Sequence, residues 1–177
     1  MKHGFFPPAA FHGDERHNDF IVQWYAKHLV TMAEPSLWVL SEDHSVHAYR
    51  FLWLRTFHQP VTVRLDVSSD GAGLLTAKVT DGRGGYESGK IVFDETTPLL
   101  ADQVNGFLAQ TERLQFWSLP TRDEGKGVGL DGAQWIMEGV QNGRYHLLDR
   151  HSPSDEKFRE TALTLTRLAN VIIRKIY

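Results

Sequence analysis

The chain has 177 residues with a mass of 20.2 kDa, and 41% of them are hydrophobic and 23% charged, so a disordered, collagen-like or coiled-coil protein is excluded. Nineteen Lys and Arg against 22 Asp and Glu give a net charge of −3, which argues against a nucleic-acid-binding scaffold. The sequence has no cysteine, which excludes thiol catalysis, disulfides and cysteine-ligated metal centres. This length predicts one domain over residues 1–177.

The N-terminus lacks the features of a secretory leader. Pro7 and Pro8 interrupt its apolar run well short of the roughly 7–15 residues that a signal peptide requires. No other segment approaches the roughly 18 apolar residues of a membrane helix. We therefore expect a cytoplasmic protein without membrane association.

An irregular arm over residues 1–17 is predicted to precede the first helix. Asn18 is a plausible N-cap, and the helix should run to about Met32, because Glu34-Pro35 ends it. Its apolar residues recur every three or four positions and predict one buried face, with His28 at its boundary. They are Phe20, Ile21, Trp24, Tyr25, Leu29 and Met32.

Four strand-like segments follow, over 46–57, 61–67, 74–79 and 90–93. The first carries apolar residues at both alternating sets of positions, which predicts burial on both faces. The second alternates strictly, with four apolar residues pointing inward. Short Gly-containing turns connect the later strands, which favours an antiparallel meander.

A second helix is predicted to begin with Thr97 as N-cap and Pro98 at its first position, with Leu99, Leu100, Val104, Phe107 and Leu108 facing inward. Residues 115–132 form a long loop of the kind that is often functional.

A hairpin over 133–140 and 144–150 is predicted from Asn142-Gly143, which favour a two-residue turn. Ser152 to Asp155 match a capping box for a C-terminal helix, whose apolar stripe extends to Ile176. The element order α-β-β-β-β-α-β-β-α predicts an α+β fold with an antiparallel sheet of about six strands packed with helices.

Several near-matches to ligand motifs fail on their context. Gly84 to Lys90 have the P-loop spacing, but Ile91 replaces the Ser or Thr and a strand follows. Gly127 to Gly132 fit a dinucleotide motif without its strand–helix surroundings. The pairs His12/His17 and His44/His47 match no four-ligand framework, so we expect neither a metal nor another cofactor.

The hairpin register places two carboxylates on one face. If Gln141 pairs with Arg144, Glu138 and Asp149 become diagonal neighbours that could act as general acid and base. The alternative is structural, with Asp149 capping a turn and Glu138 paired to Arg50 or Arg55. On the opposite face Trp135 is predicted to stack with Arg150.

His146 is the best single candidate for proton transfer, since its partner Gly139 leaves open space above the ring. Arg50 and Arg150 are candidates for holding substrate charge. Trp38 and Trp117 lie in connections, where an aromatic side chain either pins the loop to the core or anchors a partner.

Three segments of the chain also carry a resemblance. Residues 24–38 (WYAKHLVTMAEPSLW), 49–55 (YRFLWLR) and 130–153 (LDGAQWIMEG to YHLLDRHSP) resemble a scattered group of bacterial proteins without an assigned activity. The resemblance covers about half of the chain. It implies a bacterial origin and carries no functional residue across.

Three hypotheses remain open. The leading one is a non-catalytic protein-binding domain of the immunity or antitoxin type, because no catalytic motif is found and the loops carry aromatic side chains. The second is a hydrolase-like enzyme that uses Glu138 and Asp149 with His146. The third is a small-molecule carrier, which requires a pocket that the sequence does not reveal.

Overall fold

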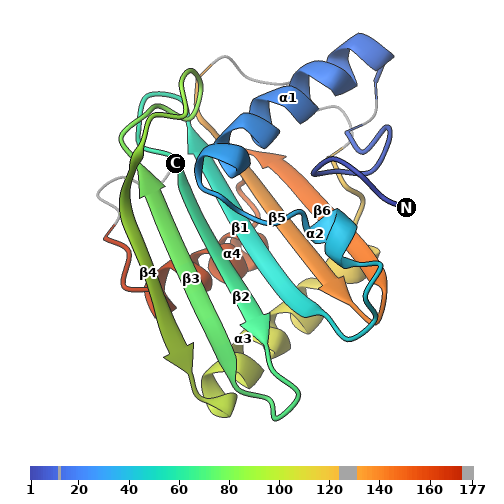
Figure 1. Cartoon of the computed structure of the whole chain (residues 1–177), viewed down its shortest axis with the longest axis vertical. Coiled ribbons are helices and arrows are strands. Elements are labelled where there is room, and N and C mark those ends of the chain that lie inside the picture. The colour runs from blue at the N-terminus through green and yellow to red at the C-terminus, as the bar shows by residue number, and fades with distance from the viewer. Residues whose placement is uncertain (12, 124–130, 173–177) are drawn as a thin grey trace.

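The computed structural model describes residues 1–11, 13–123 and 131–172. Its centre is one six-stranded antiparallel sheet in the order β4-β3-β2-β1-β5-β6 (Figure 1). The strands are β1 (His47–Arg55), β2 (Val61–Val67), β3 (Gly73–Thr80), β4 (Ile91–Leu99), β5 (Ala133–Gln141) and β6 (Arg144–His151). The predicted α+β class and antiparallel sheet are confirmed.

Helices cover both faces of this sheet. Helix α1 (Glu15–Thr31) and the short α2 (Leu37–Leu40) lie on one face, over β1, β5 and β6. Helix α3 (Ala101–Leu114), the 3₁₀ turn η1 (Phe116–Ser118) and α4 (Glu156–Leu168) lie on the other (Figure 1). Sequence analysis did not predict α2. Among the described residues, no helix is long and apolar enough to cross a membrane.

The larger apolar core lies between the sheet and the α3/α4 layer. Strand β1 contributes alternate aromatic residues to it, and Trp53 packs on Trp135 with ring centroids 4.7 Å apart. The intervening residues Leu52 and Leu54 pack under α1 with Ile21 and other apolar side chains. Strand β1 is therefore buried on both faces, as its sequence predicted.

The first helix begins earlier than predicted. Its N-cap is Asp14, whose Oδ1 accepts a hydrogen bond from His17 N at 2.8 Å, so residues 15–17 are helical rather than part of the arm. Asn18 lies inside the helix, and its side chain accepts from Phe11 N instead. Asp14 and Asn18 are both good capping residues, and spacing alone did not distinguish them.

The predicted start of the second helix is wrong. Thr97 and Pro98 continue β4, where they pair with Leu75 and Leu74, and α3 begins at Ala101. Proline is tolerated there because β4 is an edge strand, whose outer side makes no ladder hydrogen bonds. Leu100, expected to face inward, is 75% exposed.

The predicted cap and end of the last helix are also wrong. Asp155 caps α4 through bonds from Lys157 N and Phe158 N, while Ser152 Oγ accepts a bond from Ala133 N. Ile172 lies beyond the helix and is 89% exposed, and Ile176 is outside the described residues.

The β5–β6 hairpin has the predicted register. Gln141 pairs with Arg144, and both turn residues, Asn142 (φ 52°) and Gly143 (φ 76°), adopt the left-handed conformation of a type I′ turn. Glu138 is thus opposite Leu147 and Asp149 opposite Ile136, both on the α1 face.

Candidate functional site

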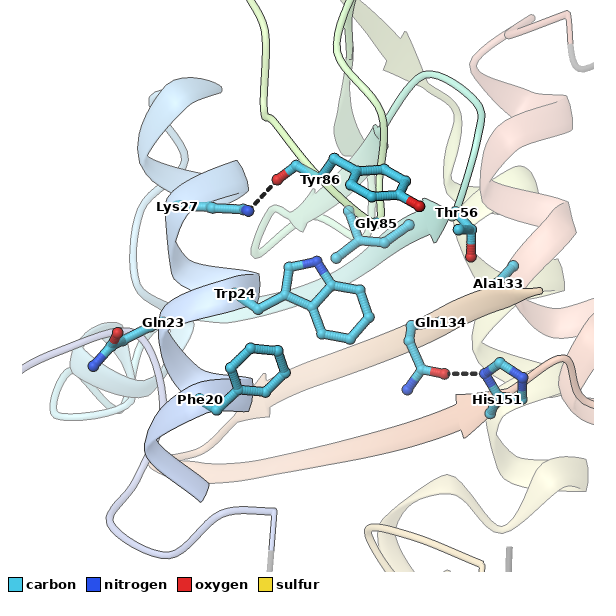
Figure 2. A pocket seen from close by; sticks show the side chains of 11 residues that line it. Phe20, Gln23, Trp24, Lys27, Thr56, Gly85, Tyr86, Ala133, Gln134 and His151 are labelled. Atoms are coloured by element: carbon cyan, nitrogen blue, oxygen red, sulfur yellow. Dashed lines mark hydrogen bonds between the residues drawn. The ribbon is translucent and has the colours of Figure 1, made fainter. Parts of the chain in front are cut away.

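The main cavity lies beside α1, where this helix meets the loop between β3 and β4 and the adjacent ends of β1, β5 and β6. Its volume is about 480 Å³. Its lining is mostly apolar and aromatic, with a few polar side chains. The lining residues are Phe20, Gln23, Trp24, Lys27, Leu54, Thr56, Gly85, Tyr86, Ala133, Gln134 and His151 (Figure 2).

Helix α1 supplies one aromatic wall. Phe20 and Trp24 are four residues apart and so share a helix face, with ring centroids 6.2 Å apart. The Trp24 indole is fixed because its Nε1 donates a hydrogen bond to Gly84 O at 2.7 Å. Phe20 is 62% exposed although it belongs to the predicted apolar face. It borders the cavity rather than the core.

The β3–β4 loop supplies a third aromatic side chain, Tyr86, and its position depends on a close backbone approach. Gly84 N donates to Arg55 O at 3.1 Å, and a Cβ on Gly84 would lie 2.6 Å from Arg55 N. Only glycine fits this approach without a shift. Lys27 Nζ donates to Tyr86 O, and the Tyr86 side chain stays 52% exposed at the cavity. Gly84, the first glycine of the P-loop-like spacing, therefore lets the loop pack against β1, whereas Gly89 lies against Gly82 within the loop itself.

A buried hydrogen-bond chain leads inward from the opposite wall. Gln134 Nε2 donates to Tyr25 Oη at 2.8 Å and to Asp149 Oδ1 at 3.0 Å. Gln134 Oε1 lies 2.6 Å from Nδ1 of His151, as Figure 2 shows. Strands β5 and β6 position these groups, since Gln134 pairs with His151.

Asp149 is the inner end of this chain and is 3% exposed. Tyr25 Oη donates to its Oδ1 at 3.1 Å, and Arg122 Nε lies 3.5 Å from its Oδ2. Burial raises the pKa of Asp149 to about 6, against the lowering effect of Arg122. Burial and the adjacent carboxylate raise the pKa of Tyr25 well above its usual value. Tyr25 therefore stays protonated and donates to the carboxylate.

Asp149 borders a separate cavity of about 10 Å³, which Gln134 and His151 also line. A space of this size holds at most one water molecule. A ligand in the main cavity thus meets Gln134 and His151, and it meets Asp149 only through them.

The second predicted carboxylate belongs to a different network. Glu138 Oε2 accepts from Arg50 Nε at 2.8 Å and lies 2.6 Å from its Nη2, while Tyr145 Oη donates to Oε1 at 2.9 Å. Arg50 also donates to Pro35 O. Glu138 and Arg50 are fully buried and line neither of these two cavities. The pair Glu138–Arg50 is the structural alternative that the sequence offered, and the two carboxylates do not converge on one cavity.

His146 lies on the α3/α4 side, away from both carboxylates. The space above Gly139 is filled, because Phe116 packs there with its ring 5.3 Å from that of His146. His146 Nε2 donates to Leu119 O at 3.0 Å, and burial lowers the pKa of the imidazole.

Trp38 and Trp117 were predicted to lie in connections, but Trp38 lies in α2 and Trp117 in η1. Their side chains and that of Arg150 contact other groups of the chain. Lys2 Nζ lies 3.8 Å above the Trp38 ring, and Trp117 packs on the core with Arg144 over its ring. Arg150 donates to the carbonyl oxygens of Pro120 and Thr121 and pairs with Asp123. The Arg150 guanidinium lies over Phe158, whereas Arg159 covers Trp135.

Within the described ranges, no group of three or more His, Asp or Glu side chains could hold a metal ion. His12 and most of the segment 127–132 lie outside those ranges. No protein-family model matches the chain, and no curated protein matches its sequence.

The sequence patterns did not predict the cavity, although two residues of its wall, Phe20 and Trp24, belong to a predicted helix face. The helical spacing predicts one buried face that includes Phe20 and Trp24, and it gives no information on Tyr86 in the Gly-rich turn. The available signal was Tyr86, the one aromatic residue in a loop (residues 81–90) of four glycines and otherwise polar residues, where no core contact is expected.

Proposed function

We propose that the protein binds a small molecule in the main cavity, and that its ligand is planar and largely apolar. The observation that carries this proposal is a cavity of about 480 Å³ bordered by three aromatic side chains, two of them more than half exposed. Cavities that hold small organic ligands commonly measure roughly 300–1,000 Å³ and combine apolar walls with a few polar groups.

The aromatic walls favour a flat ring system. Phe20 and Trp24 present their rings from α1, and Tyr86 lies above them in Figure 2. Trp24 and Tyr86 are each tied down, one by its indole N–H and the other by its backbone carbonyl. Because both anchors are hydrogen bonds within the protein itself, a ligand needs to order little of this wall when it binds.

The two other hypotheses have less support. The hypothesis of a protein-binding domain requires Trp38 and Trp117 to be available to a partner, but their rings pack within the chain. The hypothesis of a hydrolase requires Glu138 and Asp149 to share a site, but Glu138 is paired with Arg50 away from the cavity. A protein partner, the immunity-type role, the bacterial origin and the cytoplasmic location stay predictions from the sequence.

Calorimetric titration with indole tests the proposal. Phe20→Ser should weaken binding by at least about fivefold, since aromatic ring contacts contribute roughly 1 kcal/mol. Val30→Ser is the matched control, because Val30 is also on α1, is 64% exposed and does not line the cavity. Absence of binding by indole, or equal weakening by both substitutions, would contradict the proposal.

A further inference from the structure

The surroundings of Gln134 fix the orientation of its amide. Its Nε2 lies between Tyr25 Oη and Asp149 Oδ1, and Tyr25 already donates its own proton to Asp149. A reversed amide would set its oxygen against a carboxylate oxygen. Both N–H groups of Gln134 are therefore used inside the protein, and its Oε1 faces His151.

The amide in turn fixes the tautomer of His151. A carbonyl oxygen only accepts, so Nδ1 of His151 carries the proton of the 2.6 Å hydrogen bond. In the neutral imidazole Nε2 is then an acceptor with a free lone pair. The ring is half-buried and lines the cavity.

Thr56, on the same side of the cavity, also acts as an acceptor. Its Oγ1 donates its single proton to Gly132 O at 3.0 Å, which leaves only lone pairs for another partner. Figure 2 shows Thr56, Gln134 and His151 across the cavity from Phe20 and Trp24.

We infer that the ligand carries an N–H or O–H donor on the edge that faces Thr56 and His151, as an aromatic N–H heterocycle or a phenol does. This inference rests on the proposed function and adds the chemical class of the ligand. The O–H of Thr56, both N–H groups of Gln134 and the Nδ1–H of His151 already donate hydrogen bonds within the protein. This side of the cavity therefore presents acceptors, Thr56 Oγ1 and His151 Nε2, to a ligand. A ring with only acceptors on that edge would leave two acceptors facing each other, which costs binding free energy.

A pair of probes differing in one donor tests the inference on the unmodified protein. Indole and 1-methylindole are titrated by calorimetry at pH 8. We expect 1-methylindole to bind about fivefold more weakly or worse, since a net hydrogen bond is worth about 1 kcal/mol. Thr56→Val should reduce this preference, and Thr56→Ser, which keeps the hydroxyl, should retain it.

The outcomes separate this inference from the proposed function. Equal affinities of both probes, both sensitive to Phe20→Ser, would overturn the donor assignment and leave binding in the cavity intact. Binding of neither probe would overturn both. A preference for indole that persists unchanged in Thr56→Val and His151→Ala would also overturn the assignment, because the acceptors named here would not be its source.

Discussion

The buried carboxyl of Asp149 makes a quantitative prediction about stability and pH. Its pKa in the folded protein is about 6, against 3.8 for an unperturbed aspartate, and the gap of about 2 corresponds to about 3 kcal/mol. Because the folded pKa is the higher one, the native state favours the protonated acid. The stabilising contribution is complete below about pH 4 and is lost as the pH rises through 6.

Asp149→Asn removes this titration while keeping the size of the side chain. The free energy of unfolding of the variant, minus that of the unmodified protein, should therefore rise by up to about 3 kcal/mol between pH 4 and pH 7. Arg122 attracts the ionised carboxylate only, so its effect is already part of the folded pKa of Asp149; contacts of Asp149 that do not depend on its charge add an offset that is the same at every pH. His28, whose pKa burial lowers to about 4, titrates in both proteins and cancels in the difference.

Urea unfolding of both proteins at pH 4, 5, 6 and 7 measures this difference. Val30→Ser serves as the control, since it should show a difference that does not change with pH. A flat difference for Asp149→Asn, or one that falls with rising pH, would refute the assignment of a buried, proton-linked carboxyl.

Two further predictions concern the groups that hold the structure around the cavity. Arg50→Met should lower the free energy of unfolding in urea by about 3–5 kcal/mol, because it leaves Glu138 buried without its cation. The double variant Arg50→Met/Glu138→Leu should recover part of this loss. If the double variant is less stable than Arg50→Met alone, the pairing is contradicted. Gly84→Ala should lower the free energy of unfolding in urea by about 1–3 kcal/mol and weaken indole binding, since the new Cβ would lie 2.6 Å from Arg55 N. Unchanged stability would show that the loop is not held against β1.

Most of the sheet could be predicted because its signals are local. Strict alternation defined β2, and Asn142-Gly143 fixed the hairpin register to the residue. The errors lie at helix starts, where several residues compete to cap. Thr97-Pro98 has the right chemistry for a helix start, yet pairing with β3 retains both residues in the strand.

The candidate site was harder because it depends on long-range packing. Register placed Glu138 and Asp149 on one face, but it gave no information on which cations pair with each carboxylate. Arg50 comes from the neighbouring strand and Arg122 from a distant loop. The cavity exists only where α1 meets the β3–β4 loop. A hydrogen bond between Trp24 and Gly84, which are 60 residues apart in the chain, holds the helix and the loop together.

The most direct test of the account is to locate indole in the protein by nuclear Overhauser effects in solution. Leu54 is 1% exposed and lines the cavity, so its methyl groups can be approached only from inside. Our account predicts contacts from indole protons to the Leu54 methyls and none to the methyls of Val30, which lies outside the cavity on α1. Contacts to Val30 or to other surface methyls without contacts to Leu54 would contradict the proposed binding site.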